Sequence, residues 1–248
     1  MHYLLILSLV SATFLDAVAQ RPSDSNGQPT TIGELLRKHG VDLSQASLLL
    51  ALRSRDSSVR YLAAMKLAED KAVDTIPAIE ATLNAESLPR NRVNIALALG
   101  LLGDELGRDE LKKVCADKEF PSEFRMYAVR YMFDLGIEKD EGCLHAAEET
   151  VQLVDSENFH SGDRVTALEL LPRFRMLTPQ ESQTVFQLVL DRLNDSEAMV
   201  RMEASRSLAT LGNQDAIPYL DAAIAMEQDE NIRSVLETNR KDLQQKRH

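Results

Sequence analysis

Residues 195–220 read DSEAMVRMEASRSLATLGNQDAIPYL, and residues 56–70 read DSSVRYLAAMKLAED. In both stretches a Val-Arg pair is followed by Ala three residues after the Arg and by Leu seven residues after it. Apolar residues at this spacing line one face of an α-helix. The two stretches therefore predict amphipathic helices, and their likeness predicts an internal repeat.

Arginines mark the phase of this repeat, at intervals of 32, 33, 39 and 37 residues. Of the twenty residues that stand one before and three, seven and ten after these arginines, seventeen are apolar. The agreement predicts five helices that each bury the same face. The five residues, called the arginine ladder below, are Arg60, Arg92, Arg125, Arg164 and Arg201.

A second helix is predicted in each unit. Three units have a glycine eleven residues after the Arg, which suits the left-handed end of a helix, and four have Leu or Ile nineteen residues after it. Pro77 and Pro218 suit the first turn of the second helix. One helix pair cannot cover its own apolar face, so neighbouring pairs must stack. The pattern predicts an all-α solenoid of about five antiparallel helix pairs. The glycines are Gly103, Gly136 and Gly212, and the apolar residues are Ile79, Leu111, Leu144 and Leu220.

The predicted boundaries make residues 31–248 a single repeat domain. Its units span about 56–85, 89–117, 121–155, 161–194 and 196–227, with helical caps at 31–54 and 230–246. The fourth unit is irregular, because Gln183 stands where the others have Leu or Ile. Thr178 and Glu181 there predict a capping box that starts a displaced second helix.

The first 19 residues predict a secretory signal peptide. Residues 3–15 are apolar or small, and Ala17-Val18-Ala19 has the small-x-small pattern of a signal peptidase site, with cleavage between Ala19 and Gln20. The leader has no Lys or Arg, so an uncleaved anchor is the alternative. Residues 20–30 predict a flexible linker. The mature chain is expected to be secreted or periplasmic, with no membrane span.

The repeat units resemble HEAT repeats, particularly the short bacterial kind also found in phycobilisome-lyase-like proteins. The matching residues are Asp56 and Asp195 before the first helix, the Val-Arg pairs, the Ala that follows, and the Ile-Pro opening of the second helix. The resemblance covers about residues 56–230. It implies an armadillo-like helical superhelix, a fold that mostly serves as an interaction surface.

The arginine ladder has two interpretations. A cationic strip would bind an anionic partner. Alternatively, as the resemblance implies, each Arg bonds the Asp or a helix end of the neighbouring repeat. The chain carries a net charge of −11 and has no Trp. This balance favours the structural interpretation, argues against nucleic acid as a partner, and fits protein partners with basic or polar surfaces.

The two cysteines, Cys115 and Cys143, invite a disulfide in an oxidising compartment. The repeat register places Cys115 at a core position and Cys143 one position off the apolar line. Because a core thiol and an outward thiol pair only with fortunate geometry, two free thiols are expected.

No catalytic, metal or cofactor site is predicted, and the chain is not expected to be an enzyme. His145 has Glu148 and Glu149 at helical spacing, but no second His is placed to join them. Iron hydroxylases of the HEAT class use paired His-Glu dipeptides, and this sequence contains none. It also lacks a Gly-rich phosphate loop, a zinc-binding cysteine pair and a Gly-x-Ser-x-Gly elbow.

The expected function is a protein-binding scaffold of the cell envelope or extracellular space. Second helices of stacked HEAT pairs usually line the concave side, which nominates five residues as the partner surface. Two alternatives stay open: a bilin-lyase-like or chaperone-type activity, implied only by the resemblance, and a structural spacer in an envelope assembly. The five residues are Glu80, Lys112, His145, Tyr219 and Asp221.

Overall fold

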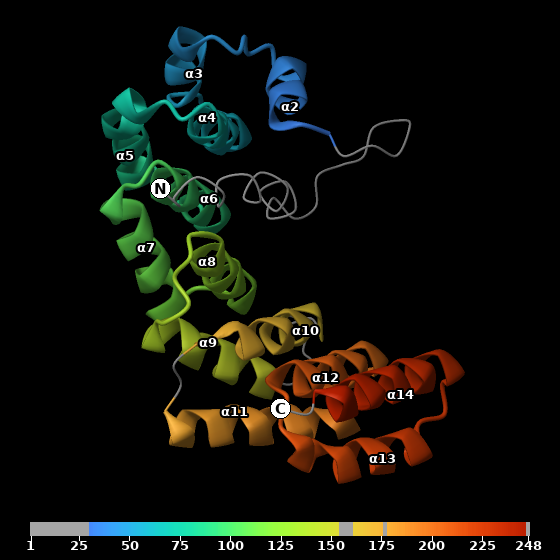
Figure 1. Ribbon diagram of the computed structural model, residues 1–248. Helices are drawn as coiled ribbons and strands as arrows, with labels where there is room; N and C mark the ends of the chain where they lie inside the picture. Colours follow the sequence, from blue (N-terminus) through green and yellow to red (C-terminus); the bar gives the residue numbers. More distant parts are fainter. Residues whose placement is uncertain (1–29, 154–160, 176–177, 247–248) are drawn as a thin grey trace, which may run out of the picture. The chain divides into compact units, whose positions relative to one another are not determined.

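The computed structural model describes residues 30–153, 161–175 and 178–246, and in these residues every regular element is a helix (Figure 1). The prediction of an all-α solenoid is therefore confirmed. The described chain falls into two compact units, 30–114 with 130–137, and 115–129 with 138–246, whose boundaries run through two helices, α7 (Glu105–Ala116) and α8 (Ser122–Asp134). The predicted signal peptide, residues 1–19, and nearly all of the predicted linker lie outside the described residues.

The first unit holds the N-terminal helices and the first two repeats. Helices α4 and α6 pack along one another, and α5 packs against α6. The face predicted from the repeat is buried here, with Leu67, Ile79, Ile95 and Leu99 each at most 1% exposed. The helices are α2 (Ile32–Lys38), α3 (Gln45–Ala51), α4 (Ser57–Glu69), α5 (Ile76–Ala85), α6 (Pro89–Leu101) and most of α7 (Glu105–Ala116), with the 3-10 turn η1 (Val73–Thr75) before α5.

A glycine allows α6 and α7 to approach closely. A Cβ built on Gly107 would lie 2.6 Å from the backbone nitrogen of Gly100, and it would also meet the carbonyl oxygen of Ala96. Any side chain at position 107 would therefore force two backbones apart. The close approach of α6 and α7, rather than an unusual backbone conformation, requires glycine at position 107.

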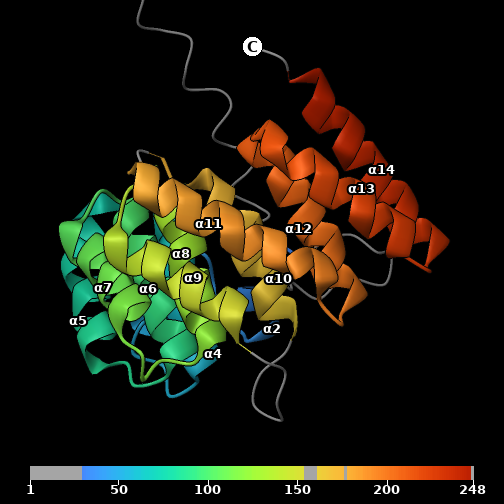
Figure 2. The ribbon, with the colours of Figure 1, turned by 90° about the horizontal axis from the view of Figure 1, so that it is seen from below.

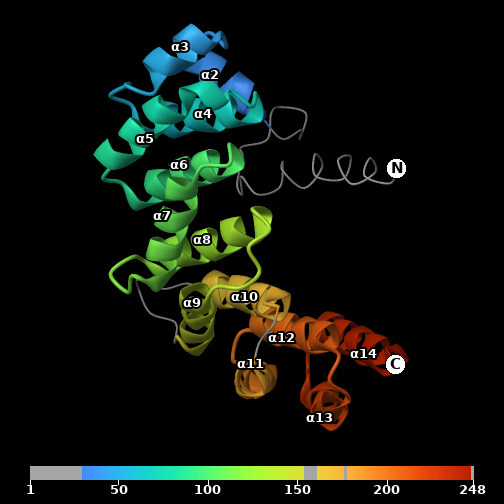
Figure 3. The ribbon, with the colours of Figure 1, turned by 60° about the vertical axis from the view of Figure 1, so that its left-hand side comes forward.

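The second unit holds the later repeats. Helices α10, α12 and α14 form one layer of this unit. Helices α11 and α13 lie on one side of that layer (Figure 3). Helix α14 packs against both α12 and α13 (Figure 2). The elements are the start of α8 (Ser122–Asp134), α9 (Glu141–Gln152), α10 (Ser161–Leu170), η2 (Leu171–Arg173), α11 (Pro179–Asp191), η3 (Arg192–Asn194), α12 (Ala198–Leu211), η4 (Gln214–Ala216), α13 (Ile217–Met226) and α14 (Glu230–Gln245).

The first helices of four repeats end in the left-handed conformation eleven residues after the ladder Arg. Gly103, Gly136 and Gly212 have φ of 87°, 75° and 76°, as predicted. In the first repeat the position is occupied by Lys71, with φ 57°. A backbone hydrogen bond from the Ala72 N–H to the Leu67 carbonyl, at 3.0 Å, closes the turn in this repeat.

The fourth repeat has the displaced second helix that was predicted. The Thr178 hydroxyl accepts from the Glu181 N–H, and the Glu181 carboxylate accepts from the Thr178 N–H, which completes the capping box that starts α11. Gln183 is exposed, and Val185 is the first buried residue of the helix.

Candidate functional site

The arginine ladder is bound within the protein rather than presented to solvent. Arg60 donates from Nε and Nη2 to Glu86 Oε2, at 3.0 and 2.6 Å, and from Nη1 to the Ser54 carbonyl at 2.9 Å. Arg201 repeats this arrangement in the fifth repeat, with Glu227 and the Asp195 carbonyl. Each guanidinium therefore joins a carboxylate to the backbone segment that closes the preceding repeat.

The middle rungs use the same two kinds of acceptor. Arg92 binds the Glu110 carboxylate and the Glu86 carbonyl, Arg125 binds Glu149 and the Cys115 carbonyl, and Arg164 lies 3.3 Å from both Asp195 Oδ2 and the Leu153 carbonyl. Arg125 and Arg164 are 7% and 4% exposed. The five arginines therefore have a structural role, and they do not form a cationic strip.

The two aspartates of the repeat motif differ in their contacts. Asp56 caps α4 by accepting from the Ser58 N–H, and its carboxylate lies 3.3 Å from His39 Nδ1. Asp195 instead faces two guanidiniums, those of Arg164 and Arg192, at 3.3 and 3.7 Å.

The carboxylates that bind Arg60 and Arg201 were not predicted from the sequence. Glu86 and Glu227 each follow their Arg by 26 residues, a shared spacing that could have identified them. The Arg201 guanidinium, helped by backbone N–H groups, lowers the pKa of Glu227 to about 2. Burial opposes the ionisation of Glu86, but the Leu88 N–H and Arg60 together still hold the pKa of Glu86 below its ordinary value.

The expectation of two free thiols is wrong, because Cys115 and Cys143 form a disulfide with a Cα–Cα distance of 4.7 Å. Cys143 is 1% exposed. Helix α9 is buried around more of its circumference than α5 or α13, so a position off the apolar line still lies inside. Gly142 adds to the fit, since a Cβ built there would lie only 3.3 Å from the Ala116 Cβ.

The carboxylates near His145 do not form a metal site. Glu149 binds Lys118 and Arg125, and these two cations lower its pKa. Burial raises the pKa of Glu148. Across residues 30–153, 161–175 and 178–246, no group of three or more His, Cys, Asp or Glu is arranged to hold a metal ion.

The five nominated surface residues divide between the two units. In the first unit Glu80 is half-buried, and Lys112 lies 3.4 Å from Asp109. In the second unit His145 and Tyr219 are exposed. Asp221 is exposed too, but its carboxylate binds Arg240 of α14 at 2.8 Å. Of the five, Tyr219 is the apolar side chain that α13 leaves open to solvent.

Tyr219 belongs to an apolar face of α13, of which only Tyr219 was predicted from the sequence. Tyr219 and Met226 stand two helical turns apart, with exposed Ala222 between them, so the three share one face. Tyr219 is 55% exposed and Met226 is 65% exposed. This face, Tyr219–Ala222–Met226, is called the α13 surface below.

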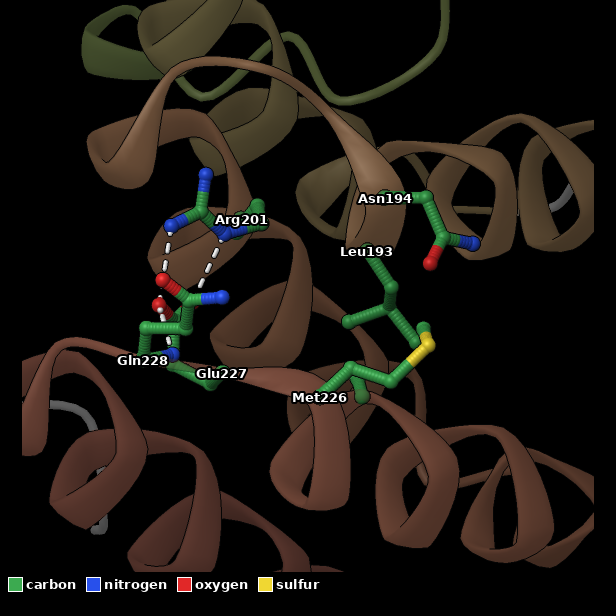
Figure 4. Close-up of a pocket in the computed structure, with 7 residues that line it drawn as sticks. Leu193, Asn194, Arg201, Met226, Glu227 and Gln228 are labelled. Carbon is green, nitrogen blue, oxygen red and sulfur yellow. Dashed lines mark hydrogen bonds and ion pairs between the residues drawn. The ribbon is translucent and has the colours of Figure 1, made fainter.

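A pocket of about 290 Å³ adjoins the α13 surface at Met226. Leu193 and Ala223 provide apolar walls, and the Met226 side chain extends toward Leu193 (Figure 4). Asn194 and Gln228 add exposed amides. The Arg201–Glu227 pair closes one side, so this rung of the ladder also shapes the pocket.

The chain matches a known protein family. A family model of HEAT repeats matches residues 46–131 and 153–239, well over half of the sequence. The chain therefore belongs to the HEAT-repeat family, and its repeats imply interaction with other proteins. No curated protein matches the chain.

Two solved structures are similar in part. One is the complex of CpcE and CpcF of phycocyanin lyase from Nostoc sp. PCC7120, with 21% identity, a TM-score of 0.46, and coverage of 80% of this chain and 76% of that chain. The other is human deoxyhypusine hydroxylase in complex with glycerol, with 14% identity, a TM-score of 0.41 and 96% coverage of both chains.

No helix in the described part of the chain is both long and apolar enough to cross a membrane.

Proposed function

We propose that this chain is a non-catalytic scaffold of the cell envelope or extracellular space that binds a protein partner through the α13 surface. The observation that carries the proposal is the exposed apolar face of Tyr219 and Met226 beside a pocket. Amphipathic Tyr and adaptable Met are residues typical of protein interfaces. The surrounding repeats hold this face on helices, which gives it a defined shape.

Export is proposed on two grounds. The leader has the apolar run and the Ala-x-Ala site of a signal peptide, with cleavage before Gln20. The disulfide between Cys115 and Cys143 is the second ground, because disulfides persist in oxidising compartments. Amino-terminal sequencing of the exported protein tests this proposal: a start at Gln20 is expected, and a start at Met1 would contradict it.

Binding is tested by photocrosslinking in the native host. A photoreactive phenylalanine analogue replaces Tyr219 in the full chain, and a matched control replaces Met199, which is 52% exposed on α12. A discrete covalent adduct with one protein is expected from position 219 and not from position 199. If neither these two sites nor sites distributed over both units give a protein adduct, the scaffold function is refuted.

Catalysis is tested separately with the purified mature protein. Pigment attached to the chain, or turnover of a bilin, would favour the lyase-like alternative over the scaffold. The absence of a protein adduct together with stable incorporation into an envelope complex would favour the spacer.

A further inference from the structure

The segment of the chain that holds the α13 surface is acidic. From Thr178 to Glu230 the chain has ten Asp and Glu, three Arg, and neither Lys nor His. This stretch of 53 residues therefore carries a formal charge of −7, out of −11 for the whole chain.

The three arginines of this stretch do not offset the exposed carboxylates, because each is already bound. Arg192 lies 3.7 Å from Asp195, Arg201 binds Glu227, and Arg206 binds Glu203 at 2.6 Å. These pairs occupy three carboxylates and all three cations. Arg240 of α14 pairs with a fourth carboxylate, that of Asp221.

The remaining carboxylates flank the α13 surface along the chain. Asp191 ends α11 just before the pocket residues Leu193 and Asn194, Asp215 precedes α13, and Glu230 follows Gln228 closely. All three acids are exposed, and none has a cation within ion-pair distance among the described residues. These three carboxylates, called the acidic border below, precede or follow the α13 surface and the pocket residues along the chain.

We propose that the α13 surface binds a basic segment of the partner protein, in which one large apolar side chain is flanked by lysines or arginines. The apolar side chain enters the pocket between Leu193, Ala223 and Met226, and the flanking cations meet the acidic border. This inference rests on the proposed function and names the chemistry of its partner.

The size of the pocket fits this occupant. At about 290 Å³ it lies at the lower end of the roughly 300–1,000 Å³ of small-molecule sites. That space accommodates one large apolar side chain. The exposed amides of Asn194 and Gln228 offer both donors and acceptors to the backbone of a bound segment.

Charge also decides against other occupants. A second copy of this chain, docked through the same face, would bring two acidic borders together, and like charges in apposition oppose association. Nucleic acid and anionic lipid are repelled for the same reason. A basic protein segment is attracted by the acidic border, and this attraction also raises its association rate.

The test uses a synthetic peptide with the mature chain, residues 20–248. The probe is a 14-residue peptide with one Trp at position 7 and Lys elsewhere. Because the protein has no Trp, the peptide fluorescence reports binding directly. The control peptide carries Glu in place of every Lys.

The expected results are specific to the α13 surface. The double variant Tyr219→Ser with Met226→Gln should raise the Kd at least tenfold, whereas Met199→Gln should leave it within twofold. The triple variant Asp191→Asn, Asp215→Asn and Glu230→Gln should raise the Kd and weaken its dependence on salt. All changed side chains are exposed, so thermal melts followed by circular dichroism should stay within 2 °C, as expected for surface substitutions.

Several outcomes would overturn the inference. These are no binding of the basic peptide, equal binding of the Glu peptide, or unchanged binding by the Tyr219→Ser, Met226→Gln variant. Self-association that this double variant abolishes would make a second copy the occupant. A crosslinked partner that meets position 219 with an acidic segment would sink this inference while the scaffold function stands, and a total lack of crosslinks would remove the function itself.

Discussion

Arg201 and Glu227 form a two-bond ion pair in the fifth repeat, from Nε to Oε2 at 2.7 Å and from Nη2 to Oε1 at 3.0 Å. The Glu227 side chain is only 4% exposed. The same carboxylate accepts from the N–H groups of Gln228 and Asp229, at 3.0 and 3.1 Å. One pair therefore closes the repeat, orders the turn into α14 and forms one side of the pocket.

The replacement Glu227→Gln should lower the free energy of unfolding by about 2–3 kcal/mol at pH 7, since it leaves a half-buried guanidinium without its charge partner. Chemical denaturation measures the change. The matched control is Asp221→Asn, which breaks the more exposed pair with Arg240 and should cost less than about 1 kcal/mol. Equal losses from the two variants would contradict the special role of the buried pair.

The stability of the protein should depend on pH through the same carboxyl. The pKa of Glu227 is lowered from 4.5 to about 2, so its stabilisation is present above pH 4.5 and is lost as the pH falls toward 2. Denaturation midpoints measured from pH 6 to pH 2 should fall, and should fall less steeply in Glu227→Gln. Parallel curves for the two proteins would show that Glu227 does not control this range.

The disulfide should stabilise the second unit. A thiol titration of the denatured, unreduced protein should find no free thiol, because Cys115 and Cys143 are joined. The double variant Cys115→Ala, Cys143→Ala should lose about 3 kcal/mol, as expected for a loop closed over 28 residues. A titre of two thiols in protein isolated from its native compartment would contradict the disulfide.

Gly107 should not tolerate a side chain. Gly107→Ala introduces a Cβ 2.6 Å from the Gly100 nitrogen, so α6 and α7 must separate, at a cost of about 2 kcal/mol. The matched control is Gly162→Ala in α10, where a Cβ meets nothing within 4 Å. There the better helix propensity of Ala should be neutral or stabilising. Thermal unfolding of the two variants distinguishes a steric contact from a general effect of removing glycine.

Lys71→Gly should stabilise the first repeat. A lysine at φ 57° is in a conformation that glycine adopts without strain, so the substitution should contribute about 0.5–1 kcal/mol. Gly212→Ala, at φ 76° in the equivalent position, should change the stability in the opposite direction. If Lys71→Gly lowers the unfolding free energy, the left-handed turn is not the source of strain there.

Local features of the fold could be predicted from the sequence because they depend on neighbours along the chain. The spacing around Arg60 and Arg201 determined the buried faces of the helices, and Gly103 and Gly212 marked their left-handed ends. The capping box at Thr178 was likewise readable, since its donors and acceptors lie three residues apart. In each case the local structure depends on the spacing of apolar residues or on a hydrogen bond between residues close in sequence.

Contacts between helices were decided only by the tertiary structure. Cys143 stood off the apolar line in sequence, yet the burial of α9 on several sides brought it to Cys115. Asp221 was expected to face a partner. Because α14 packs against α13, the Asp221 carboxylate instead binds Arg240. The α13 surface emerged because Leu220 and Ala223 are covered while Tyr219 and Met226 are not. Sequence period fixes which residues share a helix face, but the crossing and offset of helices decide which faces meet.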